Sequence, residues 1–176
     1  MENILEARVY VGTYGKYSNG SIFGKWLDLS EIEDKVAFLV ACRELHSDEG
    51  CSAEFMFQDW ENIPSNLISE CWISEHFFTL RNTIQELPEC EQKPFAVWLE
   101  NGGYDLDSED IKDLVDSFRD EYHGEYNCEE SFAEQLVDDC YDLPDFALTY
   151  FNFSKFANDL FYGDYWFENG YVFRKV

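Results

Sequence analysis

Residues 165–174 have the sequence Tyr-Trp-Phe-Glu-Asn-Gly-Tyr-Val-Phe-Arg, with an aromatic-rich run on each side of Asn169-Gly170. Aromatic and β-branched residues are enriched in strands. An Asn-Gly pair between two such runs favours a type I′ turn, because both central residues of that turn need a positive φ. The stretch therefore predicts an antiparallel hairpin.

Hydrophobic spacing upstream of this hairpin predicts three helices and a strand. We expect helices over 154–161, over 129–141, and from a cap at Asp107 or Ser108 to about Asp120. Between the last two, residues 122–126 alternate in the manner of a half-exposed strand. The inward residues should be Ile111, Leu114, Val115, Phe118, Phe132, Leu136, Val137 and Cys140.

The first sixty residues predict a small β-β-α-β unit. A strand over 8–14 is followed by Asn19-Gly20, read as a type I′ turn into a strand within 21–29. Ser30-x-x-Glu33 forms a capping box for a helix to about Leu45, with Ile32, Val36, Leu39 and Val40 as its apolar positions. Residues 54–58 then form a third strand.

The middle of the chain predicts helices. Ser74 caps a helix that Pro88 ends, Pro94 opens a further short helix, and the glycines after Asn101 close it. Together the segments predict an α+β fold: an elongated chain of three small subdomains at 1–61, 62–103 and 104–176. The first holds an antiparallel sheet with one helix, the second a helical bundle, and the third an acidic α+β unit with the hairpin.

The charge balance excludes several function classes. The 176 residues include 37 Asp and Glu against 12 Lys and Arg, a net charge of −25, yet 18% are aromatic. Nucleic acids and anionic membranes bind through clustered Lys and Arg, so direct binding to either is excluded. Acidic disordered tails lack aromatic residues, so we expect a packed core. No apolar run is long enough to span a membrane and no basic leader precedes the first residues, which predicts a cytoplasmic protein.

No residue pattern predicts a metal site, a cofactor site or an enzyme. The six cysteines form no C-x-x-C pair, and we expect free thiols that mostly fill the core. Cys42, His46 and Cys51 could supply three zinc ligands without an evident fourth, so a buried thiol and a surface histidine are favoured. The acids after Asp105 resemble a calcium loop but lack its glycine and final glutamate. A Cys-His pair such as Cys71 and His76 has no third catalytic group.

The acidic residues concentrate in the last third of the sequence. Residues 101–176 contain 19 acidic and 5 basic residues, and the ten acids from Asp120 to Asp145 are interrupted by no Lys or Arg. An ordinary solvated helix would mix in Lys, because like charges four residues apart repel each other. The candidate site is therefore an acidic surface made of Glu109, Asp113, Asp116, Asp120, Glu121, Glu125, Glu130, Glu134, Asp138, Asp139, Asp142 and Asp145.

Carboxylates three or four residues apart recur every 4.5–6 Å or so along a helix, similar to the spacing of phosphates along a DNA strand. Two chains together carry the charge of about 85 Å of duplex. Two compact chains end to end would span roughly 80 Å. These figures permit DNA mimicry, while a charge that serves only solubility stays open from composition alone.

A family resemblance supports mimicry. The chain resembles the ArdA family of antirestriction proteins, with the matching stretches in the same order and over nearly the whole chain. They are 7–17, 19–22, 24–29, 54–61, Tyr122-x-Gly124-Glu125-Tyr126, Phe132-Ala133-Glu134-x-Leu136, Tyr150-Phe151 and Phe156-Ala157-x-Asp159-Leu160. One departure is Tyr150-Phe151-Asn152-Phe153, where the family pattern is Tyr-Phe-Asp-Tyr. This departure argues against a special role for a carboxylate at position 152. It hardly affects a mechanism that rests on many charges.

The resemblance implies a DNA mimic carried by mobile genetic elements. Such a protein is an elongated homodimer that occupies the DNA-binding groove in the specificity and methyltransferase subunits of Type I restriction-modification enzymes. It implies no enzyme activity and no cofactor. The alternative is an acidic scaffold that recognises basic protein tails, which the same negative field would also steer.

Overall fold

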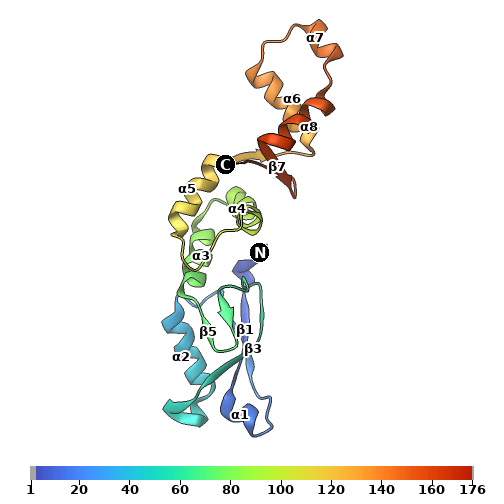
Figure 1. The fold of residues 1–176 in the computed structure, drawn as a ribbon. Coiled ribbons are helices and arrows are strands. Elements are labelled where there is room, and N and C mark those ends of the chain that lie inside the picture. Colours follow the sequence, from blue (N-terminus) through green and yellow to red (C-terminus); the bar gives the residue numbers. More distant parts are fainter. Residues whose placement is uncertain (1–2, 176) are drawn as a thin grey trace. The chain divides into compact units, whose positions relative to one another are not determined.

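The computed structural model describes residues 3–175, and its α+β class confirms the predicted fold class (Figure 1). Two compact units divide the chain, 1–114 and 115–176, with the boundary inside one helix. The division into three subdomains stays a prediction. Each unit has its own sheet and its own aromatic core.

The first unit is built on the antiparallel sheet β2-β1-β3, made of β1 (Arg8–Thr13), β2 (Lys25–Asp28) and β3 (Phe55–Glu61). The predicted type I′ turn at Asn19-Gly20 is wrong. Helix α1 (Tyr14–Ser18) connects β1 to β2 instead, and Asn19 has a φ of −90° as its C-cap. The Thr13 hydroxyl accepts the N–H of Lys16 and starts that helix. Only Gly20 has the positive φ, at 80°.

Helix α2 (Lys35–Leu45) begins later than predicted. Asp34, not Ser30, is its N-cap and accepts the N–H of Ala37 at 2.7 Å. The buried positions are Phe38 and Cys42, whereas Val36 and Val40 are exposed, so the predicted inward face is wrong. The 3₁₀ turns η1 (Ile4–Glu6) and η2 (Ser47–Ser52) complete this part of the unit.

The rest of the first unit contains a two-stranded sheet and two helices. The elements are β4 (Ile68–Ser69), β5 (Trp72–Ile73), α3 (Glu75–Glu86) and α4 (Glu89–Gly102). Ser74 caps α3 as predicted, and Gly103 ends α4 with a φ of 69°. Pro94 lies inside α4 rather than at its start, because the helix already begins after Pro88.

Aromatic side chains fill the core of the first unit. Phe38 contacts Phe57 and Phe78, with ring centroids 5.4 and 6.2 Å apart. Trp98 of α4 is fully buried and stacks on Tyr104 at 4.3 Å. Aromatic pairs of this kind add stabilisation to the area they bury. The aromatic excess of the sequence is therefore used in packing.

Helix α5 (Ile111–Glu121) contains the boundary between the units. The predicted caps Asp107 and Ser108 are wrong, since the Asp107 carboxylate accepts the hydroxyl of Ser74. Asp110 caps the N-terminus of α5 instead, because its carboxylate accepts the N–H of Lys112 at 2.8 Å. Within each unit the predicted inward residues of α5 are buried: Ile111 and Leu114 in the first, Val115 and Phe118 in the second.

The second unit is built on the antiparallel sheet β6-β8-β7 and three helices. Its elements are β6 (Tyr122–Glu125), α6 (Glu129–Cys140), α7 (Asp145–Tyr150), α8 (Phe153–Gly163), β7 (Tyr165–Glu168) and β8 (Tyr171–Arg174). The predicted hairpin is confirmed, since Glu168 pairs with Tyr171, and Asn169 and Gly170 have φ values of 52° and 90°. The alternation of β6 is confirmed as well.

Candidate functional site

Helix α6 presents the clearest part of the predicted acidic surface. Glu130, Glu134 and Asp138 are all exposed, one turn apart, and we call them the α6 row. Phe132 and Val137 are buried on the other side of the helix. The rise of an α-helix separates successive members of the row by about 6 Å along the axis. Cys140, predicted to face inward, is exposed.

Helix α5 carries a second row, Asp113, Asp116 and Asp120, which we call the α5 row. All three are exposed. Asp113 belongs to the first unit, and Asp116 and Asp120 to the second. Asp116 and Asp120 are four residues apart, so within the second unit they lie on one helical face.

Glu109 does not belong to the α5 row, although the helix predicted from Asp107 or Ser108 would have contained it. It precedes the helix and is half-buried, and its carboxylate accepts the N–H of Asp105 at 3.0 Å. The Asp105 carboxylate in turn accepts the hydroxyl of Ser108. These acids close a local turn, which accounts for the sequence pattern that resembled a calcium loop.

The remaining predicted residues are spread over the second unit. Glu121 is half-buried and Glu125 is exposed on β6. Asp139 is exposed and accepts the amide of Gln135 at 3.0 Å. Asp142 and Asp145 are exposed, one between α6 and α7 and the other in the first turn of α7.

Position 152, where the sequence departs from the family pattern, has a structural role. The side-chain oxygen of Asn152 accepts the N–H of Lys155 at 2.9 Å and caps α8. Asn and Asp serve equally well at a helix N-cap. The substitution of Asn for Asp therefore keeps the cap and removes one charge.

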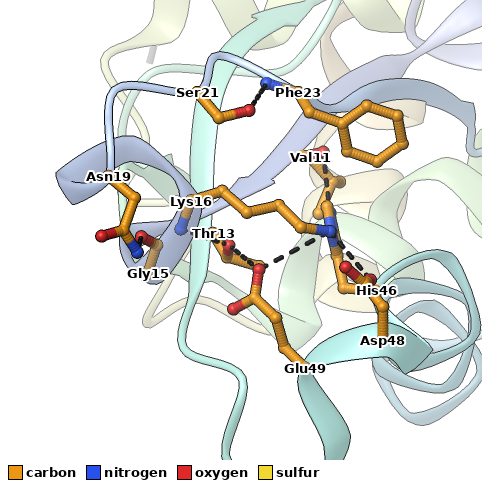
Figure 2. A network of polar contacts seen from close by, with 10 residues as sticks. All are labelled: Val11, Thr13, Gly15, Lys16, Asn19, Ser21, Phe23, His46, Asp48 and Glu49. Carbon is orange, nitrogen blue, oxygen red and sulfur yellow. Dashed lines mark hydrogen bonds and ion pairs between the residues drawn. The ribbon is translucent and has the colours of Figure 1, made fainter.

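A cluster around Lys16 was not predicted, because its members are some thirty residues apart in the sequence (Figure 2). The Lys16 ammonium contacts Nδ1 of His46 at 3.0 Å, Oδ1 of Asp48 at 2.9 Å and Oε1 of Glu49 at 3.5 Å. His46, predicted at the surface, is fully buried, and its Nε2 contacts the carbonyl of Val11 at 3.1 Å.

The contacts of this cluster determine where the His46 proton lies and how the pKa values of its charged groups change. Since the Val11 carbonyl can only accept, Nε2 of His46 carries the proton and Nδ1 accepts from Lys16. The hydrogen bond from Lys16 lowers the pKa of Asp48, and the Asp48 carboxylate raises that of Lys16. Lys16 also lies over the Phe23 ring, 4.7 Å from its centroid. The lysine thus joins α1 to η2 as a structural clamp.

Replacing Lys16 by Met should destabilise the first unit by about 1–3 kcal/mol, because the buried Nδ1 of His46 loses its donor. Thermal and urea unfolding of the variant measure this. Lys25→Met, on the exposed face of β2, is the matched control and should change stability by less than about 0.5 kcal/mol. Equal stability of the two variants would contradict the role of the clamp.

The six cysteines differ in their burial and form no metal-binding group in the described part of the chain. All six are free thiols as predicted, but five are exposed, so the prediction that most fill the core is wrong. Burial raises the pKa of the Cys42 thiol to about 12, which keeps it protonated. Residues 3–175 contain no group of three or more His, Cys, Asp or Glu placed to hold a metal ion.

These observations define the class: an acidic α+β protein whose exposed carboxylates follow helix faces in its C-terminal part. The model of the family described as antirestriction protein (ArdA) matches residues 9–173. The chain therefore belongs to the ArdA family, which confirms the resemblance seen in the sequence. That description names an antirestriction protein and not an enzyme. No curated protein matches the chain significantly. No helix within residues 3–175 is long and apolar enough to cross a membrane.

Proposed function

We propose that the protein inhibits Type I restriction-modification enzymes by presenting its carboxylates in place of DNA phosphates. The partner surface is the DNA-binding groove of the specificity and methyltransferase subunits. Lys and Arg side chains that hold phosphates in that groove would pair with the α5 and α6 rows. No catalytic step and no cofactor enter this mechanism. We further propose a cytoplasmic homodimer encoded by a mobile element.

The observation that carries the proposal is the absence of basic residues from the stretch that contains the α6 row. From Asp120 to Ser154 the sequence contains ten acids and no Lys or Arg. The α6 row lies on a folded helix with a buried opposite face, so its charges have defined positions. A partner built to hold DNA meets a continuous negative surface there, and complementary charge speeds its encounter with that surface.

Titration of a purified Type I enzyme with this protein tests the proposal. We expect DNA cleavage to stop at near-stoichiometric amounts and labelled duplex to be displaced from the enzyme. Polyglutamate of equal total charge is the control for unspecific acidity and should leave cleavage largely intact. Full cleavage in the presence of excess protein would overturn the proposal. If basic tail peptides bound under those conditions, the acidic scaffold would be the better description.

A further inference from the structure

The second unit contains a cavity of about 780 Å³ next to the α6 row. Residues of α6, α7, the segment between them and the start of α8 line it. Figure 1 shows where these three helices lie in the second unit. Its volume lies in the range of ordinary ligand sites, roughly 300–1,000 Å³. The cavity is widely open to solvent, and all its lining residues belong to the second unit.

The lining of this cavity combines carboxylates with apolar side chains. The acidic members are Glu134, Asp138, Asp139 and Asp142. The apolar members are Val137, Leu143, Leu148 and Phe153. Val137 is buried, and Leu148 of α7 is 37% exposed. The lining residues include no Lys or Arg, so no cation of the described chain neutralises the cavity from its own wall.

This combination selects a chemical class. An inorganic cation would gain nothing from the apolar lining, and an apolar ligand would meet four carboxylates. Long basic side chains suit both the carboxylates and the apolar lining, because their aliphatic stem packs on apolar surface while the charged head stays among the acids. Arginine fits better than lysine, since its planar guanidinium can bond two carboxylate oxygens at once and is more weakly hydrated.

We propose that this acidic cavity receives an arginine side chain of the partner protein together with an apolar neighbour of that arginine. The inference rests on the proposed function and names a contact that duplex DNA itself does not offer, since a phosphate row has no apolar lining. Part of the binding therefore comes from apolar burial, which salt does not screen. The protein should hold its target at ionic strengths that release DNA.

Two variants of α7 separate this contact from general acidity. Leu148→Ser removes an apolar side chain of the cavity, and Phe146→Ser removes a more exposed one, at 77%, that does not line it. Leu148→Ser should weaken binding to a Type I enzyme about tenfold and leave the slope of affinity against salt unchanged. Phe146→Ser should change affinity less than about threefold. Circular dichroism of both variants checks the fold.

A peptide probe tests the chemistry without the enzyme. A short peptide of alternating Arg and Leu should bind the wild-type protein, and the Leu148→Ser variant more weakly, in calorimetry at about 50 and 200 mM salt. A peptide with Lys for Arg should bind less tightly, and one with Ser for Leu should lose its binding at the higher salt.

The two experiments have distinguishable failures. A wild-type protein that leaves cleavage intact overturns the proposed function, whatever the peptide does. If the wild type inhibits but Leu148→Ser binds enzyme and peptide as the wild type does, the cavity proposal is wrong. Equal losses in Leu148→Ser and Phe146→Ser, with a fall in molecular mass in solution, would instead assign α7 to contact with a second copy and also overturn it.

Discussion

Replacing the six carboxylates of the α5 and α6 rows by their amides should weaken inhibition of a Type I enzyme by roughly 10- to 10,000-fold. Each screened pair between exposed charges contributes about 0.2–1 kcal/mol, and six losses add to a change of that size. The changes are Asp113→Asn, Asp116→Asn, Asp120→Asn, Glu130→Gln, Glu134→Gln and Asp138→Asn. The amount of protein for half-inhibition measures the effect, and its dependence on salt should flatten.

Matched variants separate the position of the charges from their number. Glu134→Gln alone should weaken inhibition by at most about fivefold, because the other carboxylates share the contact. Six amides in the first unit, at the exposed Glu31, Glu33, Glu44, Glu54, Asp59 and Glu86, remove the same charge and should weaken inhibition less. Loss of all inhibition in Glu134→Gln would show one specific contact in place of a charged surface. Equal losses in the two sixfold variants would show that only net charge matters.

Local rules predicted most elements of the second unit, although α7 was not predicted. The hairpin over 165–174 follows from Asn169-Gly170, whose positive φ values are a property of the turn itself. Helix α6 follows from apolar spacing, and its outward carboxylates are the same three that the sequence indicated. These features depend on residues within a few positions of one another, and a single sequence contains that information.

Long-range contacts decide the features that were not predicted. The capping box at Ser30 fails because side chains of α3 hold the carbonyls of Ile32 and Glu33, which a longer α2 would need for its own first turn. Likewise, the turn at Asn19-Gly20 is displaced because Tyr14–Ser18 forms a helix whose lysine contacts η2. No spacing rule connects such residues, so propensity is overridden by tertiary contacts.

The candidate site was likewise predicted only where it depends on residues close together in the sequence. Sequence periodicity located the α6 row, but it placed Glu109 on a helix that begins two residues later. It also missed the apolar part of the acidic cavity, because Leu148 and Phe153 line the same cavity as Val137 only in the folded chain. A period predicts which residues share a helix face and not which faces enclose a cavity.

Arg81 should be the most sensitive charged residue for stability in the first unit. Its side chain is 2% exposed and has no carboxylate partner among its described contacts. The guanidinium donates to the carbonyls of Leu29 and Ile32, the latter at 2.7 Å, and to the side-chain oxygen of Asn82 at 2.6 Å. Burial lowers its pKa, but an arginine starts so high that it stays charged.

Arg81→Met should lower the free energy of unfolding by about 2–4 kcal/mol, because carbonyls of the Leu29–Glu33 segment then lack a donor inside the protein. Urea unfolding measures the change. Arg43→Met, exposed on α2, is the matched control and should cost less than about 0.5 kcal/mol. The loss of stability in Arg81→Lys should lie between those of Arg81→Met and Arg43→Met. An ammonium keeps the charge but cannot reach several acceptors in one plane.

The comparison of Met and Lys at position 81 decides what the arginine contributes. The positive charge of Arg81 could matter, because the first unit contains few bases to balance its acids. If this charge mattered most, Arg81→Lys would keep nearly all of the stability. If the geometry of the hydrogen bonds mattered most, Arg81→Lys would lose more than half of what Arg81→Met loses. We expect the second result, because the known partners are neutral oxygens and the guanidinium replaces a helical turn as their donor. Unchanged stability in Arg81→Met would refute both explanations.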